Sequence, residues 1–464
     1  MPGRLNIKNL QQADKDYIWH PFTQMKEWIQ QSPLILSRGK GSYVFDLDGN
    51  QYLDATASIW VNIHGHRQPH IDQAIRSQLS KVAHTTLLGA SNPPAILLAK
   101  ALVRLAPKGL TKVFYSDNGS TAVEIAAKMA IQYWKQCPHP QPQKTQFIRV
   151  GSSYHGDTVG ALSLSGIEGF RRPFLSLVFP AHHIDSPYCY RCPLSLTFPD
   201  CRLACLSPLE VLLKEHHRTI AGLIIEPMVQ AVAGIIPAPP GYLRTIRDLC
   251  TRYQVLMIAD EVATGFGRTG RMFACEHEAV TPDLLAIAKG MTGGYLPLAA
   301  TLATQPIYEA FWGDLEEGLT FFHGHSYTGN PLGCAAALAT LEVFRRHRTL
   351  RKLEKRIPWL RDRLQPLRED PWVGDIRQCG YMIGIELVED RDSKNPFPPS
   401  ERIGYRIGEQ AKILGLLIRP IRDILILMPP LSATLQELQQ MVDILTLAIA
   451  LVRAKRTSSS FPVA

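Results

Sequence analysis

The sequence lacks the features that would place the protein in a membrane or outside the cell. No uncharged apolar run reaches the length of a membrane span without prolines, and the best candidate, Pro227 to Leu243, contains four prolines and Gln230. The first residues, Met1 to Lys8, lack the apolar segment of a secretory signal. Nine cysteines, an odd number, favour a reducing compartment over a disulfide framework. We therefore expect a cytoplasmic protein with no membrane partner.

Concentrated charge is also absent. The formal net charge of +9 is spread along the chain, and no basic stripe is interleaved with aromatic residues, so we expect no nucleic-acid partner. Hydrophobic residues make up 45% of the sequence and charged residues 20%, which is typical of soluble globular proteins. A chain of 464 residues is too long for one compact core and should divide into two or three packed units.

Short apolar segments alternate with helical patterns in the middle of the chain. The helix expected to start near Gly119 has apolar residues at helical spacing from Ala122 onward. Strands separated by helices form βαβ units, so this alternation predicts an α/β fold with a mostly parallel, doubly wound sheet. The expected strands are residues 112–116, 146–150, 222–225, 255–260, 284–288 and 299–303.

Asp260 and Lys289 each close a buried apolar segment. The runs from Val255 and from Leu284 up to these residues are typical of strands buried on both faces of a sheet. Charged residues at the ends of such strands lie at the sheet edge, where α/β folds bind their ligands. The lysine can form a Schiff base with an aldehyde cofactor, and the carboxylate can keep a pyridine nitrogen protonated. The pair therefore predicts a pyridoxal-phosphate site.

Two further segments suit such a cofactor. Gly119 and Ser120 lie at the start of the expected helix, where backbone N–H groups and the helix dipole favour a phosphate. A simple helix N-cap explains these residues equally well when they are taken alone, but beside Asp260 and Lys289 we prefer the phosphate site. Tyr154 follows the strand that ends at Val150, so its ring could stack on a flat heteroaromatic ring, with a packed turn residue as the alternative.

The segment Gly265 to Gly270 matches the G-x-G-x-x-G pattern of dinucleotide-binding proteins. Such a pattern should open a helix and be followed about 20 residues later by an acid at a strand end. Here the residues from Arg271 onward are a poor helix start, and the following strand ends in Lys289. We interpret the glycines as shaping a loop that presents Arg268 to a substrate carboxylate, with a nicotinamide-dependent oxidoreductase as the alternative.

Two groups of residues could be mistaken for metal ligands. A loop contains four cysteines with the spacing C-x2-C-x8-C-x3-C, namely Cys189, Cys192, Cys201 and Cys205. Four thiolates could close a zinc site, but the spacing is irregular, and we interpret these residues as ordinary thiols. His323 and His325 lie in a glycine turn without nearby carboxylates, so we expect no metal there and infer that Ser326 and backbone N–H groups meet a phosphate.

A long Ala/Leu-rich helix after about Gly329 separates two parts of the chain. The remainder has the pattern of a smaller α+β unit, and its last helix opens with a capping box formed by Thr434 and Glu437. We predict that residues 1–70 contribute to a small domain and to the active site. Residues 71–335 should form the large cofactor-binding domain, and residues 336–464 the C-terminal small domain.

Taken together, these motifs resemble the class III aminotransferases of fold type I, and the similarity runs nearly from end to end. It is carried by the segments 260–270, 289–294 and 154–157. Further segments are similar to a branch of that family that acts in biotin biosynthesis: 20–24, 60–65, 322–330, 418–420 and 427–430. The resemblance implies a homodimeric pyridoxal-phosphate transaminase that converts 8-amino-7-oxononanoate to 7,8-diaminononanoate. The alternative is another ω-aminotransferase, acting on a diamine or an ω-amino acid.

The resemblance also implies roles for individual residues. Lys289 would bind the cofactor covalently and move protons, Asp260 would pair with the pyridine nitrogen, and Tyr154 would stack on the ring; these three are the expected catalytic residues. The expected cofactor-binding residues are Gly119, Ser120, Tyr154, Glu226, Asp260, Lys289, His325 and Ser326, the last across a dimer interface. The expected substrate-binding residues are Phe22, Trp60, Tyr154, Asp157, Arg268, Lys289, Gly324 and Arg419.

Departures from the family pattern concern the amino donor. Members that use S-adenosylmethionine tend to have tyrosine at the positions of Phe22 and Ile426 and tryptophan at the position of Ile59. They also tend to have Gly-Pro-Thr where this chain has Gly-His-Ser at 324–326. Fewer polar and aromatic groups offer less contact to a bulky sulfonium nucleoside, and such changes resemble a branch that uses lysine. S-adenosylmethionine remains the expected donor, and lysine is the alternative.

Overall fold

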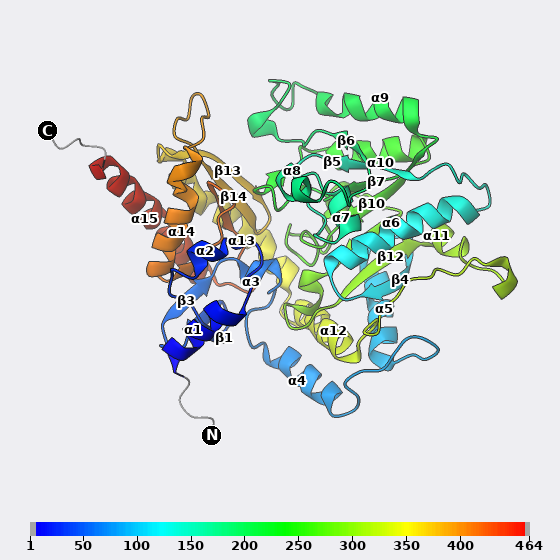
Figure 1. Cartoon of the computed structure of the whole chain (residues 1–464), viewed down its shortest axis with the longest axis horizontal. Helices are drawn as coiled ribbons and strands as arrows, with labels where there is room; N and C mark the ends of the chain where they lie inside the picture. Colours follow the sequence, from blue (N-terminus) through cyan, green and yellow to red (C-terminus); the bar gives the residue numbers. More distant parts are fainter. Residues whose placement is uncertain (1–5, 460–464) are drawn as a thin grey trace.

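The computed structural model describes residues 6–459, and its larger part is built around a seven-stranded sheet (Figure 1). In spatial order the strands are β4 (Leu110–Ser116), β12 (Ala299–Thr304), β11 (Leu284–Ile287), β10 (Leu256–Asp260), β7 (Ile220–Ile225), β5 (Gln146–Val150) and β6 (His182–Ile184). Neighbouring strands pair in parallel except at β12, which is antiparallel to both β4 and β11. The predicted mostly parallel sheet is therefore confirmed.

Helices cover both faces of this sheet, as expected for a doubly wound fold. One face packs against α6 (Gly119–Gln136) and α7 (Val159–Leu164). The other packs against α5 (Pro93–Leu105), α9 (Ser207–His216) and α10 (Tyr242–Arg252). Successive side chains of a strand point to opposite faces, so in β10 Met257 joins one apolar core and Ile258 the other. Burial on both faces explains why the strands read as continuous apolar runs.

A smaller α+β part is built from both ends of the chain. One sheet contains β1 (Leu36–Lys40), β2 (Tyr43–Asp46), β3 (Gln51–Asp54) and β15 (Leu416–Leu417), and β15 pairs in parallel with β3. A second, antiparallel sheet contains β13 (Val373–Cys379), β14 (Met382–Leu387) and β16 (Ile424–Leu427). In Figure 1 the blue N-terminal and orange C-terminal elements accordingly lie side by side. The predicted contribution of both termini is confirmed, while the exact domain boundaries remain a prediction.

The remaining elements connect these sheets and cover them. The strands β8 (Val229–Gln230) and β9 (Ile236–Pro237) form a hairpin. The helices are α1 (Ile7–Tyr17), α2 (Met25–Trp28), α3 (Ala57–Trp60), α4 (Pro69–Leu79), α8 (Glu168–Arg171), α11 (Gln305–Glu309), α12 (Pro331–Arg346), α13 (Thr349–Leu364), α14 (Ile403–Ile413) and α15 (Leu435–Ser459).

The C-terminal helix α15 begins at the predicted capping box. The Glu437 N–H donates to Thr434 Oγ1 at 3.1 Å, and the Thr434 N–H donates to Glu437 Oε2 at 2.7 Å. Within the described part of the chain, one helical stretch, residues 435–456, is long and apolar enough to cross a membrane by length and composition alone. One side of it, including Leu438, Met441 and Leu445, is buried against the protein core, so we interpret it as a core helix.

Candidate active site

A cavity of about 430 Å³ opens where several parallel strands of the large sheet end. Tyr154 follows β5, Glu226 follows β7, Asp260 ends β10 and Lys289 follows β11, and all four side chains line this cavity. Parallel strands end at the same edge of a sheet, which is why residues far apart in the sequence meet here. The predicted pairing of Asp260 and Lys289 in one site is present in the structure.

Asp260 is held by two partners at the base of the cavity. Its Oδ2 lies 2.7 Å from His155 Nδ1, and its Oδ1 accepts a hydrogen bond of 3.0 Å from the Val262 N–H. Both Asp260 and His155 are buried, and His155 Nε2 has no hydrogen-bond partner among the described residues. The imidazole fixes the carboxylate in one orientation. The sequence analysis gave His155 no role.

Lys289 faces the cavity from a strained backbone position. Its φ of +39° lies in the left-handed region, which costs a non-glycine residue roughly 1–3 kcal/mol and is typical of functional sites. Burial lowers the pKa of the Lys289 amine; the Asp260 and Glu226 carboxylates oppose this shift, whereas the Arg268 guanidinium adds to it. The amine lies 4.9 Å from the centre of the Trp60 ring and, within residues 6–459, forms no ion pair. A lowered pKa favours a neutral amine that can bind an aldehyde or accept a proton.

The start of α6 forms another wall of the cavity. Asn118 caps the helix, because its Oδ1 accepts a hydrogen bond of 3.0 Å from the Thr121 N–H, so the simpler N-cap interpretation holds as well. Gly119 and Ser120 nevertheless line the cavity. A Cβ atom on Gly156 would lie 2.0 Å from Ser120 Oγ, so glycine is required for this close approach. The helix start, with its free N–H groups and dipole, fits an anionic group such as a phosphate.

Glu226 and Tyr154 are joined at the cavity wall. Glu226 Oε1 accepts a hydrogen bond of 2.9 Å from the Tyr154 N–H, and Oε2 accepts one of 2.9 Å from the Ala231 N–H. Burial raises the pKa of Glu226 to about 7 although these bonds and His155 act against the shift. The Tyr154 hydroxyl donates to Asp157 Oδ2 at 2.6 Å, so the predicted substrate residue Asp157 is beside the cavity wall.

Phe22 reaches this wall through a residue that the sequence analysis did not identify. The Phe22 and Phe170 rings have their centres 5.5 Å apart, and the Phe170 and Tyr154 rings lie 6.0 Å apart. These spacings are typical of aromatic pairs. Phe22 is 62% exposed, which leaves its ring available for further contact. Phe170, on α8, thus links the N-terminal segment to Tyr154.

Trp60 is carried by a left-handed turn. All four residues of α3, Ala57 to Trp60, have positive φ values between +46° and +69°. Asp54 supports the turn, because its carboxylate accepts hydrogen bonds from the Ser58 N–H at 3.0 Å and the Ser58 hydroxyl at 2.8 Å. Burial alone would raise the pKa of Asp54, but hydrogen bonds from His66 and Ser58 outweigh it, and the pKa is lowered.

Arg268 holds the other end of this turn. Its guanidinium is buried and donates to four backbone carbonyls, Pro429 O at 2.5 Å, Asn62 O at 3.0 Å, Trp60 O at 3.2 Å and Met428 O at 3.5 Å. Gly265 to Gly270 do form a loop rather than a helix start, which argues against dinucleotide binding. The loop directs Arg268 to backbone carbonyls, whereas the sequence predicted that it faces a substrate. Contact between Arg268 and the substrate stays a prediction.

Eight of the predicted residues do not line this cavity. Four of them, Phe22, Trp60, Asp157 and Arg268, lie around it as described above. The other four are Gly324, His325, Ser326 and Arg419. Gly324 and Ser326 are exposed, and His325 Nε2 lies 3.9 Å from Asp117 Oδ1, a residue that does line the cavity. Arg419 follows β15 and is exposed. The structure therefore brings the predicted catalytic residues together but places these four outside the cavity, three of them exposed and His325 half-buried, and their roles remain predictions.

Comparisons with known proteins show the family and the fold of the chain. The family model of the class-III aminotransferases matches residues 24–449. An adenosylmethionine-8-amino-7-oxononanoate aminotransferase from Geobacter sulfurreducens is 49% identical over 94% of this chain and 96% of its own. The crystal structure of the enzyme of that name from Methanocaldococcus jannaschii is 45% identical with a TM-score of 0.92, covering 96% of this chain and 99% of its own. A PLP-bound amine transaminase from an uncultivated Pseudomonas species is 36% identical with a TM-score of 0.90, over 94% and 99%.

Proposed function

The chain belongs to the class-III aminotransferase family, and we propose that it transfers an amino group to 8-amino-7-oxononanoate to give 7,8-diaminononanoate in biotin biosynthesis. The observation that carries this proposal is the 49% identity, over nearly the whole length of both chains, to a relative named for that reaction. Another ω-aminotransferase activity is the second candidate, because an amine transaminase shares the fold with a TM-score of 0.90. Both candidates are pyridoxal-phosphate-dependent transaminations.

The residues around the cavity fit this cofactor. Pyridoxal phosphate, when bound, supplies an electron sink for the negative charge that develops next to the transferred amino group. Lys289 offers an amine with a lowered pKa for its aldehyde, and Asp260, fixed by His155, can keep a ring nitrogen protonated. Gly119 and Ser120 at the start of α6 would hold the phosphate. We assign Lys289 as the group that holds and moves the proton.

Substrate would enter between Trp60 and Tyr154. The Trp60 ring lies next to the Lys289 amine, and the Tyr154 hydroxyl donates a hydrogen bond to Asp157. Both rings can therefore exclude water from the reacting atoms. Arg419, with its bidentate fork, is our proposed partner for the distal carboxylate of the nonanoate. Phe22 would close the donor side of the site through its contact with Phe170.

A homodimer would give the exposed segment around Ser326 a function. Large apolar side chains are exposed here, with Phe322 at 83%, Tyr327 at 62% and Leu88 at 79%. The ring of His84, on the same segment as Leu88, contacts Tyr327 with ring centres 4.8 Å apart, so the two segments form one surface. Such an apolar surface is typical of a subunit interface. We propose a cytoplasmic homodimer in which Ser326 serves the other subunit's cofactor phosphate.

The test follows the two halves of the reaction separately. Purified enzyme loaded with pyridoxal phosphate is mixed with S-adenosylmethionine or with lysine, and loss of the visible absorbance of the cofactor identifies the amino donor. Addition of 8-amino-7-oxononanoate should then restore the absorbance and yield 7,8-diaminononanoate by mass spectrometry. We expect S-adenosylmethionine to act, with lysine as the alternative donor, and Lys289→Ala to be inactive with either. If an ω-amino acid or a diamine removes the absorbance and an oxo acid restores it, while 8-amino-7-oxononanoate does not, the second candidate function is correct.

A further inference from the structure

The loop between β6 and α9 brings four cysteines to one small cavity. This four-cysteine cluster consists of Cys189, Cys192, Cys201 and Cys205. The other lining residues are apolar or uncharged and include Pro187, Pro193 and Phe198. The sequence spacing alone favoured ordinary thiols. Their convergence on a single cavity, which the sequence could not reveal, is the observation that changes this interpretation.

The chemistry of the cluster calls for a cation. Thiolates this close to one another repel each other, and no basic side chain lines the cavity. A soft divalent ion removes the repulsion by binding the thiolates directly. The pairs C-x2-C and C-x3-C both have the spacing of structural zinc sites.

The thiols are not positioned as ligands in the present side-chain arrangement. Among residues 6–459, no three histidine, cysteine, aspartate or glutamate side chains are arranged to hold a metal ion. A cysteine has only one side-chain torsion, so binding would require each thiol to rotate about that torsion toward a common point.

We propose that the four-cysteine cluster is a structural zinc site that fixes the loop of residues 185–206. One zinc ion bound by four thiolates would give a closed tetrahedral site with no position open for catalysis. The site would be separate from the transamination cavity. None of the four cysteines lines that cavity.

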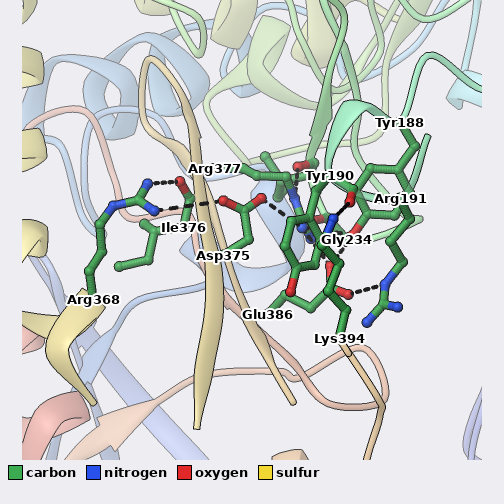
Figure 2. Close-up of polar contacts among 11 residues, drawn as sticks. Tyr188, Tyr190, Arg191, Gly234, Arg368, Asp375, Ile376, Arg377, Glu386 and Lys394 are labelled. Carbon is green, nitrogen blue, oxygen red and sulfur yellow. Dashed lines mark hydrogen bonds and ion pairs between the residues drawn. The ribbon is translucent and has the colours of Figure 1, made fainter. Parts of the chain in front are cut away.

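The loop has a structural partner that a zinc ion would keep in place. Tyr188 directly precedes Cys189, and Arg191 directly precedes Cys192. Figure 2 shows that both side chains reach Glu386 on β14. The Arg191 Nε donates to Glu386 Oε1 at 2.6 Å, and the Tyr188 hydroxyl donates to Glu386 Oε2. These contacts join the cysteine loop of the large part to the antiparallel sheet of the small part.

The same network continues to the transamination site. Arg377 on β13 donates through Nη1 to Glu386 Oε2 at 2.5 Å, through Nε to Ile235 O at 2.9 Å and through Nη2 to Gly234 O at 2.8 Å (Figure 2). Gly234 and Ile235 lie in the β8–β9 hairpin, and Val232 of the same hairpin lines the transamination cavity. A fixed cysteine loop thus supports one wall of that cavity at a distance.

The first test is the zinc content of the full-length enzyme. Holoenzyme purified without a metal-affinity step is analysed for zinc by mass spectrometry, and we expect about one zinc ion per chain. Cys189→Ser and Cys205→Ser should each reduce the zinc content roughly ten-fold or more. Cys137→Ser is the matched control, because Cys137 lies outside the cluster and its thiol donates to His139 O at 3.3 Å, a bond that serine can also make. The control should retain its zinc.

A second test does not depend on the folding of variants. Wild-type enzyme is stripped with a chelator under reducing conditions, Zn²⁺ is added back, and alkylation of each cysteine is measured by peptide mass spectrometry. We expect zinc to protect the four cluster cysteines and no others. The proposal is overturned if all four thiols alkylate equally with and without added Zn²⁺. It is also overturned if the four cysteines form disulfides with one another, or if the serine variants retain their zinc. None of these measurements depends on transaminase activity, so the proposed function is tested separately.

Discussion

Replacement of Arg268 by methionine would separate a structural role of this residue from contact with substrate. In the structure the guanidinium is 1% exposed and donates to Trp60 O, Asn62 O and Pro429 O. Methionine has a similar length and no donor. The substitution would therefore leave these carbonyls buried without their partner while it keeps most of the packing.

The expected loss follows from these contacts. A hydrogen bond from a charged donor contributes about 1.5–3 kcal/mol, and removing one partner of a buried charged network typically costs about 3–5 kcal/mol. The left-handed turn of α3 opposes this loss, because each such residue stores roughly 1–2 kcal/mol that relaxation can release. We expect the free energy of unfolding to fall by about 3 kcal/mol. Relaxation of the turn should also move Trp60 away from Lys289 and lower kcat.

Urea unfolding of the holoenzyme at one fixed protein concentration measures the first effect, and steady-state kinetics measure the second. Arg271→Met is the matched control, since Arg271 lies in the same loop but is exposed, and it should behave like the wild type. If Arg268→Met unfolds at the wild-type urea concentration while KM for 8-amino-7-oxononanoate rises and kcat is unchanged, Arg268 binds substrate and the structural reasoning is refuted.

Three further predictions address the cavity wall. Gly156→Ala should weaken binding of pyridoxal phosphate at least ten-fold by fluorescence titration, since its Cβ would lie 2.0 Å from Ser120 Oγ; unchanged affinity would contradict the phosphate site. The pKa of Glu226 is raised from 4.5 to about 7, so the folded state holds a proton that the unfolded state releases. Wild type should lose stability relative to Glu226→Gln as pH rises from 4.5 to 7, and parallel urea profiles would disprove this. Phe170→Ala should raise KM for the amino donor several-fold with cofactor affinity retained; loss of cofactor instead would show that Phe170 serves Tyr154 alone.

The parts of the fold that sequence predicted correctly depend on local patterns. The sequence predicted, to within a residue, the strands ending at Val150 and Asp260 and the start of the helix at Gly119. Apolar runs and helix caps depend only on residues that are close together in the sequence. The positions of Asp260 and Lys289 in one cavity followed from a topological rule, since parallel strands end at one sheet edge. Asp260 and Lys289 could therefore be predicted as neighbours in one site from the sequence alone.

Other parts depend on contacts between distant segments, which no local pattern reveals. The partnership of His155 with Asp260 spans 105 residues, and that of Arg268 with Trp60 spans 208. The four-stranded sheet that joins β3 to β15 was not predicted, because β15 contains only two residues and has no periodic signal. The left-handed turn at Trp60 could not be read from its residues either, since none is glycine. Hydrogen bonds from Ser58 to Asp54 and from the distant Arg268 to Trp60 O hold that conformation.

The pairing of Asp260 with His155 rather than with Lys289 explains how one cavity can serve two opposite charge requirements. A carboxylate in direct contact with Lys289 would hold the amine in its charged form and remove it from chemistry. Instead His155 Nδ1 and the Val262 N–H bind the two oxygens of Asp260, so Asp260 opposes the lowering of the Lys289 pKa only from a distance. His155 thereby preserves a fixed negative charge for a ring nitrogen and a neutral amine for an aldehyde. Because both conditions must hold at once, we infer that His155 is as necessary to the site as the two residues it separates.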